Sequence, residues 1–241
     1  MEKPNILYED NQLLVAWKEA GVAVQSSGIG QPDMESRIKT WLSGKTRERV
    51  PYLGIVHRLD QPVEGLVVFG RTREAAAGLS RQLTEQRMKK WYLAVVEKEL
   101  KPGEEYMLED YLKKERQQAV VCCESDPKAK KALLICRVIA AAEGKSLLLI
   151  ELLTGRFHQI RCQLSHRGMP IAGDVRYGGS KAIQQKNIAL CAWHLVFEHP
   201  RSGKPLCFTH CPSGEAFGCF EKEIAGLREM DFTAAKPAEG V

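Results

Sequence analysis

Three short segments of the chain carry residue types that are able to do chemistry. The first has the sequence HRLD and runs from His57 to Asp60, and the turn-forming residues Pro62 and Gly65 follow it. A loop at the end of a strand can hold a reactive carboxylate firmly and still leave it exposed. An Asp in a loop more often caps a turn, so Asp60 by itself fits a structural role as well as a catalytic one.

The second segment, KWYLA, runs from Lys90 to Ala94 at the start of an apolar stretch. Strand alternation places Tyr92 and Ala94 on one face and Trp91 and Leu93 on the other. A tyrosine ring beside a small alanine could form a platform for a planar base. The alternative is an ordinary aromatic side chain of the core.

The third segment, TGRFHQIR, runs from Thr154 to Arg161 and is predicted to join a strand to a helix. Arg161 lies close to the apolar face that Ile160 and Leu164 define. A buried guanidinium needs a carboxylate or a phosphate as its partner, because burying an unpaired charge is costly. A solvated helix Arg is the alternative.

The elements that must position these segments are mostly strands. Short apolar runs predict strands at residues 5–8, 13–17, 55–56, 65–69, 91–96, 119–123, 132–140, 146–153, 188–197 and 205–209. Helical spacing predicts helices at residues 34–42, 74–86 and 157–166. Many strands with few helices, and no strict alternation of the two, indicate an α+β fold. We expect one domain over residues 1–228 and a frayed tail over residues 229–241.

Composition restricts the kind of protein and its partners. The chain has 241 residues, of which 44% are hydrophobic, and eight cysteines, too few for a disulfide scaffold. With no signal peptide or membrane span apparent, we expect a cytoplasmic protein with no membrane partner. The net charge of +5 is uneven, since residues 156–186 carry six Arg or Lys against one Asp. Such a segment suits the binding of phosphates, although a solvated basic face is equally compatible.

Taken in order, the three segments resemble the motifs of the RluA-type pseudouridine synthases. The resemblance rests on HRLD, then K-x-Y-x-A, then G-R-x-H-Q-I-R, and finally G-D-x-x-Y-G from Gly173 to Gly178. It extends over residues 6–220, and its ordered motifs are specific. It implies a pseudouridine synthase fold, with a mixed, largely antiparallel β-sheet core and flanking helices and loops.

The resemblance also implies a reaction and a set of site residues. The family isomerises uridine in RNA to pseudouridine without a metal or an organic cofactor. By resemblance, Asp60 is the nucleophile, Tyr92 stacks beside the target uracil, and Arg161 is the cation paired with Asp60 through a two-pronged contact. We expect a monomer that binds a stem-loop of ribosomal or transfer RNA, in a form that lacks an S4 domain. Further substrate-binding residues are expected to be His57, Arg58, Lys90, Arg156, His158, Gln159, Arg176 and Tyr177.

Four positions depart from the family pattern. Val63 and Glu64 stand where Thr-Ser is usual after HRLD, Gln163 replaces a usual His, and Glu19 replaces the Pro that usually follows Lys18. None of them removes a proposed catalytic residue. We therefore expect the departures to affect substrate recognition rather than catalysis.

Other classes of protein remain as alternatives. Cys207, His210, Cys211 and Cys219 could form a zinc site, but their spacing fits no common pair of ligands, and alternation predicts that Cys207 and Cys211 are buried in a strand. Cys162 could act as a nucleophile with His158 or His166. A catalytically inactive RNA-binding protein on the same fold is the main alternative.

Overall fold

One sheet contains every strand that the structure describes. A computed structural model of the chain describes residues 4–26, 33–45, 50–180, 187–229 and 232. Within these residues the strands form a single eleven-stranded sheet. Their bounds are β1 (Ile6–Glu9), β2 (Leu13–Lys18), β3 (Gly54–Ile55), β4 (Glu64–Gly70), β5 (Lys89–Val96), β6 (Glu105–Glu115), β7 (Gln118–Cys122), β8 (Lys130–Ala142), β9 (Lys145–Leu152), β10 (Leu190–Glu198) and β11 (Pro205–Thr209).

The order of the strands is β1-β2-β4-β10-β5-β9-β8-β6-β7, with β3 beside β4 and β11 beside β10. All pairs are antiparallel except β4 with β10, which is parallel. The predicted α+β class and the mixed, largely antiparallel sheet are therefore confirmed.

A glycine makes the parallel contact between β4 and β10 possible. Gly65 pairs with Ala192 across the two strands and has a φ of +145°. A Cβ atom at this position would lie 2.4 Å from the Cβ of Ala192. Any larger residue would push β4 away from β10, and with it the loop that carries Asp60.

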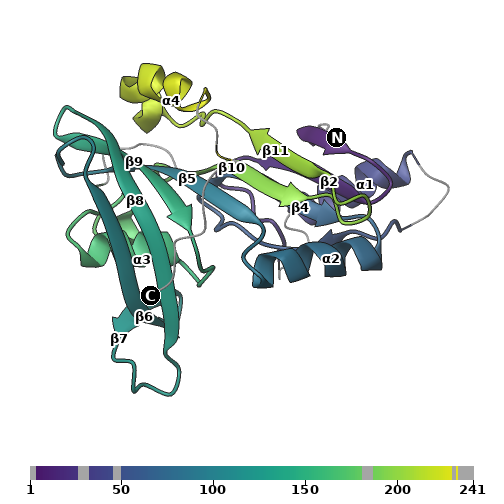
Figure 1. The fold of residues 1–241 in the computed structure, drawn as a ribbon, viewed down its shortest axis with the longest axis horizontal. Coiled ribbons are helices and arrows are strands. Elements are labelled where there is room, and N and C mark those ends of the chain that lie inside the picture. Colours follow the sequence, from purple (N-terminus) through teal and green to yellow (C-terminus); the bar gives the residue numbers. More distant parts are fainter. Residues whose placement is uncertain (1–3, 27–32, 46–49, 181–186, 230–231, 233–241) are drawn as a thin grey trace.

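Helices cover different parts of the sheet. Their bounds are α1 (Met34–Ser43), α2 (Arg73–Thr84), α3 (Gln159–His166) and α4 (Glu221–Leu227), with short 3₁₀ turns at Val175–Tyr177 and Glu215–Phe220. Asp33 and Thr72 cap the N-termini of α1 and α2 by accepting hydrogen bonds from Ser36 N–H and Ala75 N–H. Figure 1 shows α2 along the half of the sheet that contains β4, whereas α3 lies beside β6 and β8 at the other end.

The sequence pattern did not predict β6, and it did not predict α4. Only Leu108 and Leu112 are buried along the eleven residues of β6, and charged side chains fill most other positions. Such a strand has too few apolar residues to produce a clear alternation. Together β6, β7 and β8 form long hairpins that project at one end of the molecule (Figure 1).

Two sequence predictions concern the C-terminal part of the chain, namely the burial of two cysteines and a frayed tail. Cys207 was expected to be buried in its strand, but it is exposed, and Cys211 follows the strand and is half-buried. This prediction is wrong because β11 lies beside β10 with Leu206 and Phe208, rather than Cys207, packed against the core. The expected frayed tail lies almost wholly outside the described residues. No helix in the described part of the chain is long and apolar enough to cross a membrane.

Candidate active site

A pocket of about 1080 Å³ opens where the ends of β5 and β9, the start of α3 and the loop after residue 56 meet. All the catalytic and substrate-binding residues that the sequence predicted, except Tyr177, line it. Its lining includes Asp60, Tyr92, Arg161, His57, Arg58, Lys90, Arg156, His158, Gln159 and Arg176.

Backbone contacts hold the loop that carries Asp60. Val63 N–H donates to the Asp60 carbonyl at 3.0 Å, and Gly21 N–H donates to the carbonyl of Gln61 at 2.8 Å. The buried ammonium of Lys18 donates to the same Gln61 carbonyl at 3.0 Å, and also to the carbonyls of Glu19 and Val22. These contacts fix the backbone on both sides of the carboxylate.

Arg161 lies between two carboxylates. Its Nη1 donates to Oδ2 of Asp60 at 3.0 Å, while Nε and Nη2 donate to Oδ2 and Oδ1 of Asp174 at 2.6 and 2.8 Å. Arg161 is 4% exposed and Asp174 is 1% exposed. The expected pairing of Arg161 with Asp60 is present, but the two-pronged contact is made to Asp174. Asp174 therefore neutralises and orients the guanidinium, which in turn offers one N–H to Asp60.

The environment of Asp60 raises the pKa of its carboxyl group. Burial raises the pKa of Asp60, and Arg161 opposes that rise without cancelling it. The side chain is still 24% exposed, toward the pocket. Asp60 is thus a carboxylate with few hydrogen bonds from the protein, held beside a cation and open to a ligand.

A chain of hydrogen bonds fixes the imidazole of His158. The Tyr177 hydroxyl oxygen accepts a hydrogen bond from Ala119 N–H at 2.7 Å and lies 2.9 Å from Nδ1 of His158, within hydrogen-bond distance. Burial, assisted by Arg161, lowers the pKa of His158 to about 3. The ring is therefore neutral, and its Nε2 lies 3.5 Å from Oδ2 of Asp60.

His158 also has an unusual backbone conformation. His158 precedes α3 with φ 50° and ψ 28°, in the left-handed region that residues other than glycine seldom adopt. Such a conformation persists only where the surroundings demand it, and it is common at functional sites. Tyr177 lies behind His158, so the structure places it in support of the pocket wall rather than in the lining.

Tyr92 and Lys90 project from the same face of β5 into the pocket. Tyr92 is 6% exposed, and burial raises the pKa of its hydroxyl far above the usual value, so the phenol stays protonated. Trp91, on the opposite face, packs against His194 and Phe232. The sheet therefore holds the Tyr92 ring at the pocket wall.

The remaining predicted residues differ in how free they are to bind a ligand. Arg58 is exposed, whereas half-buried His57 accepts a hydrogen bond from Val68 N–H at 3.3 Å. Gln159 accepts hydrogen bonds from Thr154 and Arg156 and donates to the carbonyl of Leu133. Its amide thus shapes the turn before α3. Arg156 and Arg176 are exposed, and each donates one hydrogen bond to a backbone carbonyl.

Comparison with known proteins assigns the chain to a family. The sequence profile of the family described as RNA pseudouridylate synthase matches residues 12–166, a stretch that contains Asp60, Tyr92 and Arg161. The chain belongs to the RNA pseudouridylate synthase family. The resemblance to the RluA-type members, stated above on motifs alone, is confirmed.

Relatives agree with this assignment, and a solved structure shows the same fold. The chain is 32% identical over 217 residues to ribosomal large subunit pseudouridine synthase D of Xanthomonas campestris, and this covers 84% of the chain but only 64% of that protein. It is 33% identical to the protein of the same name from Zymomonas mobilis, covering 84% of the chain and 67% of that protein. The solved human RNA pseudouridylate synthase domain containing 4 superposes with a TM-score of 0.72 over 92% of this chain and 93% of that one, at 18% identity, which shows the common fold.

Among the departures from the family pattern, Val63 lines the pocket, whereas Glu64 and Gln163 make their hydrogen bonds within the fold. Glu64 is 3% exposed and accepts hydrogen bonds from the backbone N–H groups of Ser213 and Gly214 and from the Ser213 hydroxyl. Gln163 is fully buried and donates to carbonyls of β6 and β8 and to Asp110. At Glu19 only the backbone carbonyl is used, which a proline would also supply. These residues hold the fold together in this member of the pseudouridylate synthase family.

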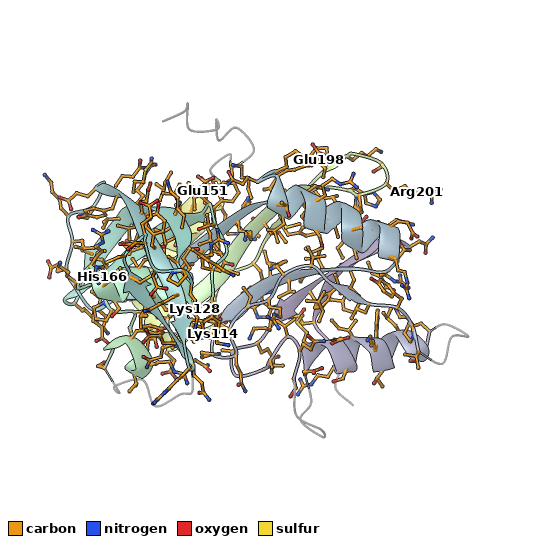
Figure 2. The ribbon with its side chains drawn as sticks, turned by 90° about the horizontal axis from the view of Figure 1, so that it is seen from below. Lys114, Lys128, Glu151, His166, Glu198 and Arg201 are labelled. Atoms are coloured by element: carbon orange, nitrogen blue, oxygen red, sulfur yellow. The ribbon has the colours of Figure 1, made fainter. Side chains whose placement is uncertain are left out.

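Asp174 and Lys18 are the site residues whose roles sequence reasoning missed. Asp174 belongs to the motif G-D-x-x-Y-G, and Lys18 ends an apolar strand next to the departure at Glu19. A charged residue at a position that must become buried was the available signal. The cysteine alternative is not supported, because burial raises the pKa of Cys162 to about 11 and His166 is exposed at the end of α3 (Figure 2). Among the described residues, no group of three or more His, Cys, Asp or Glu is arranged to hold a metal ion.

Proposed function

We propose that this protein is an RNA pseudouridine synthase, an isomerase that converts specific uridines in structured RNA to pseudouridine with Asp60 as the nucleophile. The observation that carries the proposal is the carboxylate of Asp60, open to a pocket and held beside the buried Arg161. Family membership supplies the reaction class. The cytoplasmic location and the monomeric state remain predictions.

The reaction breaks the N-glycosidic bond of uridine and joins the ribose to C5 of the turned uracil. An ionised Asp60 is required whether it attacks C1′ of the ribose, attacks C6 of the base or assists a glycal-type intermediate. Arg161 favours this ionised form, and its double contact with Asp174 keeps it from turning away. The final step removes the proton from C5, so release of the C5 hydrogen reports turnover.

The substrate base must leave its stack to reach Asp60. Tyr92 offers a ring at the wall of the pocket, and the basic side chains around the opening are suited to hold the flanking phosphates. Because the relatives are named for the large ribosomal subunit, we propose ribosomal RNA of that subunit as the substrate to test first, with transfer RNA second.

The direct test is release of tritium from C5-labelled uridine in RNA that lacks the modification. Mapping of pseudouridines in cellular RNA with and without the gene would then identify the position. Turnover supports the proposal. Binding of the RNA without any release of tritium, in the presence of correctly folded protein, would instead identify a catalytically inactive RNA-binding protein.

Tyr92→Ala is expected to lose both base stacking and turnover, whereas Tyr92→Phe is expected to keep RNA binding. Removal of a stacking ring costs about 1–3 kcal/mol of binding free energy per base. Affinity is measured by filter binding and turnover by tritium release, with thermal unfolding to check the cavity that Ala leaves. Equal affinity and equal turnover in wild type and both variants would remove Tyr92 from the active site.

Arg176→Ala is expected to weaken RNA binding and to flatten its dependence on salt. Arg176 shares a hollow beside the pocket with Lys114, Arg116 and Lys128, and Figure 2 shows Lys114 and Lys128 close together. Each phosphate contact that is lost should reduce the slope of log affinity against log salt by about 0.7–0.9. Lys181, a second candidate, lies outside the described residues.

Arg201→Ala is the matched control for the salt experiment. Arg201 is also exposed but lies at the opposite end of the molecule from Lys114 and Lys128 (Figure 2). Its substitution should leave the slope unchanged. If both variants shift the slope equally, the RNA path does not run along the Arg176 side.

A further inference from the structure

Two lysines are buried near the active site, and their surroundings differ. Lys18 is 1% exposed and donates to three backbone carbonyls, with Asp60 and Glu64 nearby. Lys90 is 7% exposed, yet no hydrogen bond or ion pair to its ammonium is present among the residues that the structure describes. Burial lowers the pKa of Lys90 to about 8, and no neighbouring carboxylate opposes this effect.

The ammonium of Lys90 faces the pocket. Lys90 and Gly155 both line it, and a Cβ atom at Gly155 would lie 3.6 Å from Nζ of Lys90. Gly155 is exposed, so the absence of a side chain there leaves the approach to Nζ open. A buried cation without a partner is costly, so the position is explained best by a ligand that supplies the missing negative charge.

The position of Lys90 relative to Tyr92 suggests which anion this is. The two residues are two apart on one face of β5, which separates their Cα atoms by about 7 Å. This separation is comparable to that between a nucleobase and its own phosphate. A uracil beside Tyr92 would therefore bring a flanking phosphate to Lys90. Asp60 and Asp174, the acidic residues of the pocket lining, are both engaged with Arg161.

We propose that Lys90 is the phosphate-binding residue of the uridine subsite, and that its ammonium pairs with a phosphate group flanking the uridine whose base lies against Tyr92. The inference rests on the proposed function, because it takes the pocket to be the uridine site. The negative oxygens of the phosphate would accept hydrogen bonds that no described residue of the protein accepts.

The test compares the binding of uridine, uridine 3′-monophosphate, uridine 5′-monophosphate and inorganic phosphate, each titrated into the full chain and followed by NMR. Wild type should bind one of the two monophosphates about tenfold more tightly than uridine, as expected for one charge-assisted contact. Lys90→Met should bind uridine as wild type does and lose the tenfold gain. Lys90→Arg should retain part of it.

Lys89→Met is the matched control, because Lys89 is the neighbouring residue on the opposite face of β5 and pairs with Glu151 at 3.5 Å. It should keep the preference for the monophosphate. Thermal unfolding separates a ligand-binding lysine from a structural one. Lys90→Met should not lower the unfolding temperature, since its ammonium stabilises no other group.

Three results would overturn the proposal. They are equal affinity of wild type for uridine and both monophosphates, a preference that survives in Lys90→Met, and inorganic phosphate that binds as tightly as the preferred monophosphate. None of these measurements requires turnover. Failure of the tritium assay would therefore refute the proposed function without deciding the role of Lys90. Failure of the binding experiments would refute the role of Lys90 without deciding the proposed function.

Discussion

Asp60→Asn is expected to reduce turnover by at least about a thousandfold, with RNA affinity and folding almost unchanged. Asparagine has nearly the shape of aspartate but lacks the negative charge, so it cannot act as a nucleophile. The fold should survive because Arg161 keeps both oxygens of Asp174 when the charge at residue 60 is removed. We expect the free energy of unfolding to change by less than about 1 kcal/mol.

The dependence of turnover on pH gives a second measure of the same residue. Burial raises the pKa of Asp60 above the usual 3.8, and the reactive form is the ionised one. Turnover should therefore fall as the pH is lowered through this raised pKa, at a higher pH than an ordinary aspartate would produce. His158, whose pKa is lowered to about 3, stays neutral over this range and should not contribute.

Glu105→Gln is the control for these measurements. It is also a change from carboxylate to amide, but Glu105 lies on β6, half exposed and paired with Arg137. It should retain full turnover and an unchanged pH profile. A folded Asp60→Asn protein that releases tritium at the wild-type rate would refute the assignment of the nucleophile and with it most of the proposed mechanism.

Sequence patterns predicted the elements whose apolar residues follow a clear period. The strand at Lys89–Val96 and the helices α1 and α2 were expected close to their observed bounds, because their apolar residues follow the period of the element. The strand β6 was not, because half of it faces solvent and its charged residues hide the alternation. Cys207 was placed wrongly because period two fixes the alternation along a strand but not which of its faces lies toward the core.

The candidate site could be predicted as a set of residues but not as a set of contacts. The motifs gather Asp60, Tyr92 and Arg161 because each motif marks a strand end or a helix start that the sheet brings to one pocket. The partner of the two-pronged contact could not be predicted, because neither Asp60 nor Asp174 lies on the helix of Arg161 at a spacing that would fix a contact. Nor does any periodicity reveal the left-handed backbone at His158, which tertiary packing imposes.

Asp174→Asn is expected to have the largest effect on stability, lowering the free energy of unfolding by about 3–5 kcal/mol. Arg161 would remain buried with a single contact to Asp60, and the cost of an incompletely paired internal charge would appear in the folded state. Turnover should fall as well, since the guanidinium would be free to turn toward Asp60 and to draw its carboxylate out of position. Urea unfolding and tritium release measure the two effects.

The double variant Asp174→Asn with Arg161→Met separates charge burial from catalysis. Replacing both members of a buried pair removes the unpaired charge, so much of the stability lost in Asp174→Asn should return. Turnover should not return, because Asp60 would lose the guanidinium whose charge and hydrogen bond oppose the rise of its pKa on burial. Glu105→Gln, which changes an exposed pair in which Nε and Nη2 of Arg137 both donate to one carboxylate oxygen, should cost no more than about 1 kcal/mol. A double variant that regains turnover together with stability would show that Asp174 and Arg161 serve only the fold and that Asp60 reacts without them.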